Sequence, residues 1–295
     1  MKEAGYIVNC VLNAFLSYTA IALNSVTIHA LRKAASLPKP LKTLLLSLAV
    51  SDLGVGLIVQ PLFIAVTAKK SSTYDITFIV YRSTMNLLAY ASFFGVMALS
   101  ADRFLAIHLH LRYQELVTHK RVVAVVISIW LFSALLSLLR FCLPENFTSV
   151  IFAFTIASCL FATTLFYYKI YIAVRRHANQ IRRSQQEQQA AQNSEMENAA
   201  TLRKFAVGAF FVYLAFLVCY LPRTCTLVAS IFTSSTNFNG GTLYTTTLVF
   251  LNSSLNPLIY SWKMRHIRNA AIGILWNMLR SHNQRTAGED AIQSP

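Results

Sequence analysis

Charged residues are scarce in this chain. They make up only 13% of its 295 residues, about half the share that a soluble globular domain carries. Acids are the rarest of them, with 11 Asp and Glu against 26 Lys and Arg and a formal net charge of +15. Hydrophobic residues reach 55%, and the mean hydropathy is +0.50. This composition excludes a soluble globular domain.

Signatures of several other protein classes are also missing. The sequence has no repeated halves with paired broken helices, which disfavours a secondary transporter, and a transporter or channel remains only a remote alternative. It has no HExxH motif, no nucleophile–base–orienter set and no His/Cys metal-ligand set in its apolar runs, so we expect no enzyme, no metal and no required cofactor. No cleavable signal pattern precedes the first apolar run, which we expect to be retained.

What the chain has instead is seven long apolar runs. Each has roughly 20 or more residues, enough to cross about 30 Å of hydrocarbon. Spanning segments must satisfy their backbone groups internally, which predicts helices. We therefore expect an all-α membrane protein with a seven-transmembrane helix bundle over residues 1–262. The approximate spans are 6–31, 41–67, 76–106, 121–142, 147–173, 203–233 and 241–261.

The basic residues indicate how the bundle is oriented. Most of the 26 Lys and Arg fall in alternate connections and the C-terminal segment. By the positive-inside rule this places the N-terminus outside the cell, as in a multi-pass plasma-membrane protein. The positive charge then forms an inner surface that attracts membrane lipids or an acidic protein, and nucleic acid is not expected as a partner.

The connections are also informative. Residues 180–198 are polar without apolar periodicity, which predicts a mobile inner loop. Residues 263–280 place apolar side chains at helical spacing, which predicts an amphipathic helix on the inner membrane surface, followed by a short tail over 281–295. Asn146-Phe147-Thr148 is a glycosylation sequon in a predicted outer loop, which makes Asn146 a candidate acceptor.

Polar residues inside the apolar runs carry most of the information. Asp52 is the only acid within the second run. A lone carboxylate in lipid needs partners, and amides and hydroxyls of other runs can supply them. The alternative is that each polar group makes a separate packing hydrogen bond between helices. Their number favours one cluster that holds water or a cation, with candidates Asn24, Asp52, Ser92, Asn252, Ser253 and Asn256.

The third run has a consistent inner stripe. Its members are separated by 3, 7 and 11 residues, close to multiples of the helical period, and they are Arg82, Met85, Ser92 and Arg103. The run ends in the adjacent acid and base Asp102 and Arg103. A charge at the edge of a membrane helix indicates function by default, whereas the structural alternative is that Arg103 snorkels to the interface and pairs with Asp102.

Two interpretations remain open for three arginines near the outer ends of the runs. They are Arg82, Arg140 and Arg223. Arginine recognises carboxylate and phosphate groups well. Each side chain can equally snorkel to the outer headgroups, and Arg82 can pair with Asp75 at the rim. If Arg82 and Arg223 face a cavity, the site favours an acidic ligand. The ligand-pocket candidates are Arg82, Met85, Asn86, Tyr220, Arg223 and Thr246.

Short motifs in order, one set per run, give the chain a resemblance to a known family. The chain resembles the rhodopsin-like (class A) G-protein-coupled receptors over nearly its whole length, because seven weak motifs in the right order are jointly specific. The motifs are Asn24, Leu48-Ala49-Val50-Ser51-Asp52, Asp102-Arg103-Phe104, Trp130, Tyr167, Phe216 with Cys219-Tyr220-Leu221-Pro222, and Asn256-Pro257-Leu258-Ile259-Tyr260.

The resemblance implies roles for these residues and implies an extracellular ligand and a heterotrimeric G protein as partners. Arg103 is the switch arginine that meets the G protein, and the coupling set is Asp102, Arg103, Phe104, Tyr167 and Tyr260. The implied pocket for a possible allosteric sodium ion comprises Asp52, Ser92, Asn252, Ser253 and Asn256. The implied activation hinge comprises Phe216, Tyr220, Pro222 and Pro257, where the prolines remove helix hydrogen bonds.

Departures from the family pattern narrow the comparison. The family's usual outer disulfide is not expected, because its position in the third run is Phe78, and the five cysteines are expected to be buried free thiols. Many members carry an acid at the position of Leu202. The short outer loops and the missing disulfide resemble the melanocortin, cannabinoid, lysophospholipid and adenosine receptors, melanocortin receptors most of all.

Ligand chemistry is only partly constrained. Met85 stands where amine receptors carry Asp, and Phe250 stands where retinal receptors carry the Schiff-base Lys, so both classes are disfavoured. The ligand itself stays unknown. One expectation is a melanocortin-like receptor, and the alternative is an adenosine- or lysophospholipid-type receptor for a small acidic or nucleoside-like ligand.

Overall fold

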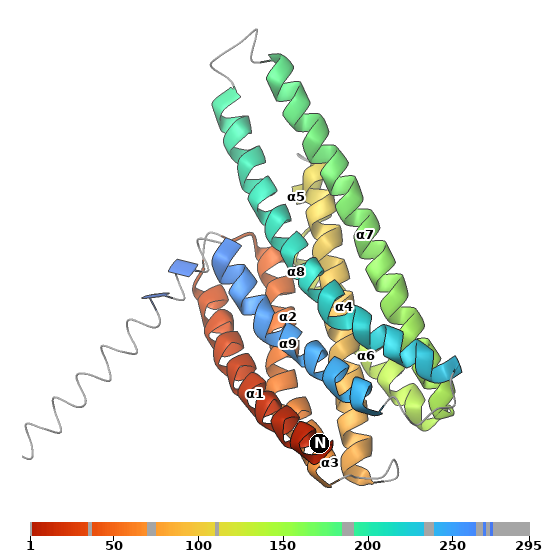
Figure 1. Ribbon diagram of the computed structural model, residues 1–295. Coiled ribbons are helices and arrows are strands. Elements are labelled where there is room, and N and C mark those ends of the chain that lie inside the picture. The colour runs from red at the N-terminus through yellow and green to blue at the C-terminus, as the bar shows by residue number, and fades with distance from the viewer. Residues whose placement is uncertain are drawn as a thin grey trace, which may run out of the picture.

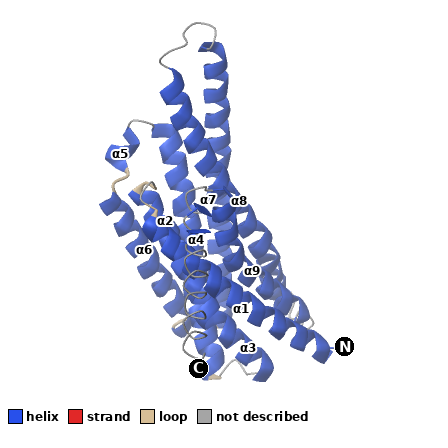
Figure 2. Ribbon diagram, turned by 90° about the vertical axis from the view of Figure 1, so that its left-hand side faces the viewer, coloured by secondary structure: helices blue, strands red, loops and turns tan. Residues whose placement is uncertain are grey.

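In the part of the chain that it describes, the computed structural model is a bundle of long helices (Figure 1). Every regular element in that part is helical, and it contains no strand (Figure 2). The described residues are 2–34, 37–69, 75–109, 112–184, 192–232, 239–263, 268–269 and 272–273. The elements are α1 (Lys2–Lys33), α2 (Lys39–Gly54), η1 (Val55–Val59), α3 (Gln60–Lys69), α4 (Ile76–Leu109), α5 (Tyr113–Leu116), α6 (His119–Leu138), η3 (Leu139–Phe141), α7 (Glu145–Ser184), α8 (Gln192–Phe232) and α9 (Asn239–Lys263).

The helices match the seven apolar runs, which confirms the predicted fold class. In the described chain, six helical spans are long and apolar enough to cross a membrane. One of them joins α2, η1 and α3 into a single span over Lys39–Lys69. The seventh helix, α9, is more polar because it carries Asn252, Ser253, Ser254 and Asn256. Since those side chains are buried in the bundle, α9 needs less lipid-facing surface.

The outer surface of the bundle is apolar. On α6 the side chains of Leu131, Leu135 and Leu138 are more than half exposed, at 68%, 56% and 58%. Apolar surface of this extent is stable when it faces lipid chains. The helical exterior therefore supports a multi-pass membrane protein.

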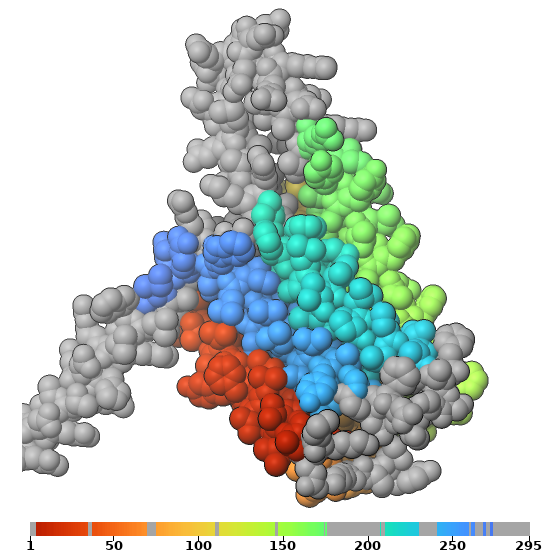
Figure 3. Space-filling model, viewed as in Figure 1, coloured from red at the N-terminus to blue at the C-terminus, as the bar shows by residue number. Residues whose placement is uncertain are grey.

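Helix α4 occupies the centre of the bundle. It packs against α2, α3, α6, α7 and α8. Around it, α1 packs on α2 and α9, while α8 packs on α7 and α9. One face of the molecule shows α1, α9, α8 and α7 side by side in that order (Figure 3). Functional side chains on α4 can thus meet residues of most other helices.

A π-helical turn interrupts the second span. It covers Val55–Val59 and is followed at once by Gln60 and Pro61. Pro61 has no N–H to donate and its ring crowds the preceding turn, which a widened turn relieves. The turn also brings the Gly56 carbonyl to the Ser17 hydroxyl of α1, which donates to it at 2.8 Å. The apolar pattern of the run gave no sign of this interruption.

The close contact at Gly56 gives a stability prediction. A Cβ atom there would lie 3.0 Å from Ile21 Cγ1 and 3.2 Å from the Ser17 carbonyl oxygen. We expect Gly56→Ala to cost about 1–3 kcal/mol because α1 must move to admit the methyl group. Thermal unfolding of the purified protein measures the effect. Gly95→Ala is the matched control, since its Cβ would meet nothing nearer than Leu48 Cδ1 at 3.7 Å; equal melting temperatures for the two variants would refute the prediction.

The loop predicted over residues 180–198 is wrong over most of its length. Helix α7 continues to Ser184 and α8 begins at Gln192. Both helices extend beyond the bundle at the end opposite the N-terminus (Figure 1). The segment is rich in Gln, Glu, Ala and Arg, which favour helix, and elongation of an existing helix avoids the unfavourable nucleation step. Polarity without apolar periodicity was therefore an unreliable sign of a loop here.

Two further predictions concern the ends of the chain and the outer loop. The predicted outer loop at 143–148 is shorter than expected, because α7 begins at Glu145. The sequon thus lies in the first turn of α7, and the side chain of Asn146 is outside the described residues, so its glycosylation stays a prediction. Of the predicted surface helix 263–280, only residues 268–269 and 272–273 are described beyond α9, and both pairs are helical. The rest of it and the tail lie outside.

All five cysteines are free, which agrees with the expectation of no disulfide. Their predicted burial is right only for Cys159 and Cys219. Cys10 is half-buried, while Cys142 and Cys225 are exposed. Cys225 lies within a membrane span, where an exposed thiol faces lipid and a small apolar group is well accommodated.

Candidate functional site

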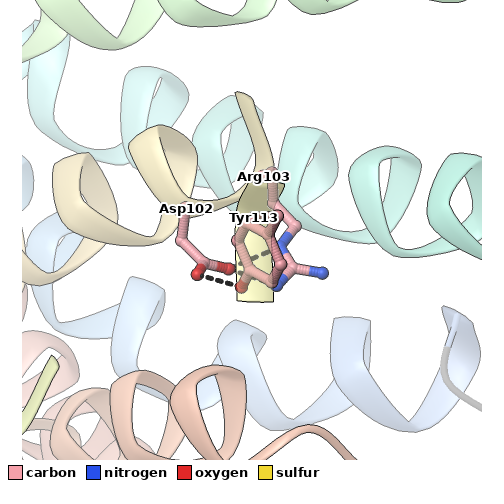
Figure 4. A network of polar contacts seen from close by, with 3 residues as sticks. All are labelled: Asp102, Arg103 and Tyr113. Atoms are coloured by element: carbon pink, nitrogen blue, oxygen red, sulfur yellow. Dashed lines mark hydrogen bonds and ion pairs between the residues drawn. The ribbon is translucent and has the colours of Figure 1, made fainter. Parts of the chain in front are cut away.

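The C-terminal end of α4 carries a buried charge pair. Arg103 forms a salt bridge with its neighbour Asp102, and both side chains are 4% exposed. The Arg103 Nε atom donates to Asp102 Oδ2 at 2.9 Å. The other oxygen of Asp102 accepts a hydrogen bond from the Tyr113 hydroxyl at 2.6 Å (Figure 4). Arg103 is buried in the bundle, so its side chain does not snorkel into water.

Tyr113 links this pair to the connection between α4 and α6. It lies in the short helix α5 and is half-buried. Burial of the ring, followed by the charge of Asp102, raises the pKa of Tyr113 above its ordinary value. The hydroxyl therefore keeps its proton at neutral pH and remains a donor to the carboxylate. The tyrosine holds Asp102, and Asp102 in turn holds Arg103.

Other members of the predicted coupling set lie near the same end. The Tyr167 hydroxyl is 3.3 Å from the Ser100 hydroxyl, one turn before Arg103, and its ring stacks on Tyr213 of α8 at 5.3 Å. Phe104 faces α7, with its ring 5.8 Å from Phe166. Tyr260 is on α9 and Leu202 is on α8, but both side chains are outside the described residues. The structure thus brings Asp102, Arg103, Phe104 and Tyr167 to one end of the bundle.

A cluster of buried polar side chains lies in the middle of the bundle. Asn256 of α9 donates from Nδ2 to Asp52 Oδ2 of α2 at 2.8 Å. The Ser92 hydroxyl of α4 is 3.0 Å from that of Ser51, the neighbour of Asp52. Asn24 of α1 donates to the Ser253 carbonyl at 2.9 Å. These bonds join four helices through groups that are almost completely buried.

Several atoms of this cluster have no hydrogen-bond partner among the described residues. They are Asp52 Oδ1, Asn24 Oδ1, Asn256 Oδ1 and both side-chain atoms Oδ1 and Nδ2 of Asn252. Buried polar groups normally find partners, in protein or in ordered water. Carboxylate and amide oxygens are also the ligands of hard cations. The donor set therefore fits a sodium ion with water, in which Asp52 supplies the negative charge.

Three aromatic rings of α4 and α8 form a second buried group. Phe216 and Tyr220 of α8 stack at 4.9 Å, and both contact Phe93 of α4, at 5.6 and 4.5 Å. All three side chains are buried. Pro222 follows within α8, and Pro257 lies within α9 next to Asn256. Two of the predicted hinge residues of α8, Phe216 and Tyr220, are thus packed directly on the central helix.

An open cavity of about 320 Å³ lies beside the N-terminal part of α4. It is walled by α3, α4, α7, α8 and α9. Five of the six ligand-pocket candidates line it, namely Arg82, Met85, Asn86, Arg223 and Thr246. Tyr220 is not among the lining residues and belongs to the aromatic cluster below. Along α4, Arg82 and Arg103 are separated by 21 positions, about 30 Å at the helical rise, so the cavity and the charge pair lie at opposite ends.

Sequence reasoning missed several residues of these sites. Tyr113 lay in a connection whose tertiary contacts no periodicity reveals. Ser51 stands next to Asp52 in the motif, but only the packing of α2 on α4 shows its bond to Ser92. Phe93 follows Ser92 in a run that is apolar throughout, so nothing distinguished it. Asn9, Asn13 and Thr247 form a further buried hydrogen-bonded group between α1 and α9.

Comparison with known proteins agrees with this arrangement. The family described as "7 transmembrane receptor (rhodopsin family)" matches residues 23–260. The human protein named melanocortin receptor 3 is 25% identical over 280 residues, which cover 88% of this chain and 84% of that protein. A chimpanzee protein, melanocortin receptor 5, is 28% identical over 269 residues, with 86% and 80% covered. A sheep protein, adenosine receptor A3, is 26% identical over 285 residues, with 87% and 86% covered.

A family match over most of the chain identifies its class. The chain belongs to the rhodopsin-like family of seven-transmembrane G-protein-coupled receptors. It is a multi-pass membrane protein of the plasma membrane and a receptor rather than an enzyme. The relatives bear out the predicted neighbourhood of melanocortin and adenosine receptors.

Proposed function

We propose that the protein transmits the binding of an extracellular ligand to heterotrimeric G proteins. The observation that carries the proposal is the buried Asp102–Arg103 pair at one end of α4, with an open cavity at its other end. A buried charge pair is costly to form and weak as a source of stability, which suggests that it is kept for a function. Exposure of Arg103 on the inner side would offer a strong donor to a partner protein.

Packed side chains lead from the cavity toward the middle of the bundle. Arg223 of the cavity wall is next to Pro222, and Tyr220 below it contacts Phe93. The next layer holds Ser92, Asp52 and Asn256. Ligand-induced movement of α8 about Pro222 would repack the aromatic cluster and release the inner end. A ligand shifts such an equilibrium only by its differential affinity for the two states.

Orientation and ion binding belong to the same proposal. We place the N-terminus and the cavity outside the cell, because the basic residues concentrate at the other end. A sodium ion would favour the inactive packing, because it would supply a positive charge to the buried carboxylate. Its ligands would be Asp52, Asn252 and Asn256 with Ser92 and Ser253. The receptor is of melanocortin type or, alternatively, of adenosine or lysophospholipid type for a small acidic or nucleoside-like ligand, and the melanocortin and adenosine receptors among its relatives support these classes.

Nucleotide exchange tests the proposal. The full-length protein in lipid nanodiscs is mixed with each class of heterotrimeric G protein, and the exchange of GDP for a labelled GTP analogue is followed. We expect at least one class to exchange faster than with empty nanodiscs, and faster still when a ligand is found. No acceleration with any class, with or without ligand, would overturn the proposal and leave a channel or transporter to be tested by flux.

Removal of the Tyr113 hydroxyl should raise ligand-free exchange. Tyr113→Phe deletes the hydrogen bond to Asp102 and keeps the ring. A bond to a charged group contributes roughly 1.5–3 kcal/mol, and less at a half-buried position. We expect basal exchange to rise about two- to tenfold as Arg103 is released more often. Tyr168→Phe is the control, because Tyr168 is exposed on the outer face of α7; unchanged exchange in Tyr113→Phe would mean that the bond does not restrain the pair.

A further inference from the structure

Arg223 occupies an unusual place in the cavity wall. It follows Pro222 in α8 and is half-buried, and its Nε atom is buried without a hydrogen-bond partner among the described residues. Its electrostatic neighbours are Tyr81 and a second cation, Arg82. The Tyr81 hydroxyl is already engaged, since it donates to Met85 Sδ at 3.1 Å. An arginine that snorkels to the headgroups would face lipid, whereas this one faces the cavity.

Among the described residues, the wall around Arg223 offers no negative charge. None of the described residues that line the cavity is acidic. Two guanidinium groups of like sign in a partly desolvated cleft repel each other, and Arg223 is better accommodated when an anion lies beside it. Arg82 also lies over the Phe78 ring at 5.9 Å, which keeps it in the wall. The missing countercharge for Arg223 is most simply supplied by whatever fills the cavity.

The remainder of the wall sets the shape of the ligand. Apolar and aromatic side chains supply most of it, including Phe63, Val66, Phe152, Leu227 and Leu243. The volume of about 320 Å³ is at the small end of the range of roughly 300–1,000 Å³ for small-molecule sites. A compact ligand with an apolar part and one acidic group would fit a cavity of this size and lining.

We propose that the receptor recognises its ligand through a carboxylate or phosphate group that binds the guanidinium of Arg223 beside Arg82, with the apolar part of the ligand against Phe63 and Leu243. The proposal rests on the proposed function in one respect, namely that binding of the ligand leads to signalling. The binding itself does not require a G protein. Arginine suits this role because its planar fork can donate two parallel hydrogen bonds to one anion. The anion can belong to a soluble ligand or to a lipid headgroup.

The test uses matched pairs of an acid and its neutral counterpart. The pairs are phenylpropionate and its amide, decanoate and decanamide, and lauroyl lysophosphatidate and monolauroylglycerol. Thermal unfolding of the full-length protein is measured in nanodiscs of zwitterionic lipid with each compound. A second set of nanodiscs contains phosphatidylglycerol, which separates a lipid headgroup from a soluble acid as the source of the anion.

We expect at least one acid to stabilise the wild type while its neutral partner does not. Arg223→Gln should weaken that acid roughly tenfold to a hundredfold, the value of a charge-assisted bidentate contact. Arg223→Lys should retain part of the affinity, which excludes simple misfolding. Arg140→Gln is the matched control, because it removes the same charge from an outer arginine that does not line the cavity. If phosphatidylglycerol alone gives the Arg223-dependent stabilisation, the anion is a lipid headgroup.

Three results would overturn the inference: equal stabilisation by acids and neutral partners, equal binding of an acid to wild type and Arg223→Gln, or no stabilisation of the wild type by any acid or by phosphatidylglycerol. Failure here is distinct from failure of the proposed function. Acid binding without nucleotide exchange would refute coupling alone, and exchange without acid binding would refute this inference alone.

Discussion

Arg103→Ala is expected to abolish the acceleration of nucleotide exchange, basal and ligand-driven, while the protein still reaches the cell surface. The arginine is held by Asp102 at the inner end of the central helix, and its release would present the donor that a G protein binds. Removal of Arg103 leaves Asp102 with its bond from Tyr113, so the carboxylate does not become partnerless. We therefore expect loss of signalling without loss of folding.

The measurement is exchange by purified receptor in nanodiscs, with surface expression determined in parallel by antibody labelling of intact cells. Arg32→Ala is the matched control, since it removes an exposed arginine at the inner end of α1. Wild-type exchange by Arg103→Ala would show that the charge pair is structural. Poor expression of the variant would be resolved by Arg103→Lys, which keeps the charge and loses the fork geometry.

Asp52→Asn is expected to remove the sensitivity of basal exchange to sodium. In the wild type, sodium should reduce exchange several-fold, as expected for a coupling free energy of about 1–3 kcal/mol between an ion site and a global state. The carboxylate is the only charged group of the central polar cluster, and its Oδ1 atom has no partner among the described residues. Asparagine keeps the size of the side chain and the bond distance to Asn256, but not the negative charge.

Sodium is titrated at constant ionic strength, with choline as the replacement cation, so that general screening cannot imitate the effect. Asp75→Asn removes a carboxylate at the outer rim and serves as the matched control. Equal sodium responses in wild type and Asp52→Asn would refute the ion site. The cluster would then be a set of interhelical hydrogen bonds with water, the alternative that the sequence left open.

The course of the chain was largely predictable because a membrane imposes a simple rule. Seven apolar runs had to become helices, and the described helices coincide with them. The rule applies only where lipid surrounds the chain. It does not place the ends of α7 and α8, which leave the membrane and continue as helices through helix-forming polar residues. It also does not detect the π-turn at Val55–Val59, since apolar residues fit either kind of helix.

In the sites, too, the sequence indicated the residues that stand out locally but not those whose role depends on tertiary contacts. Asp52 and Arg103 were conspicuous because charge is rare in apolar runs. The helical period placed Arg82 and Met85 on one stripe, and both line the cavity. Tyr113, Ser51 and Phe93 escaped notice because each depends on a partner distant in sequence. Tyr220 was predicted to line the ligand pocket, but packing directs it to Phe93 rather than into the cavity wall.

One comparison tests the central claim most directly: ligand-free nucleotide exchange by wild type, Tyr113→Phe, Arg103→Ala and the double variant, in the same nanodiscs with the same G protein. A cycle of this kind measures the coupling of two contacting residues. If Tyr113 acts by restraining Arg103 through Asp102, Tyr113→Phe exceeds wild type, while Arg103→Ala and the double variant both fall to the rate with empty nanodiscs. Elevated exchange in the double variant would contradict the account, because the signal would then reach the G protein without Arg103.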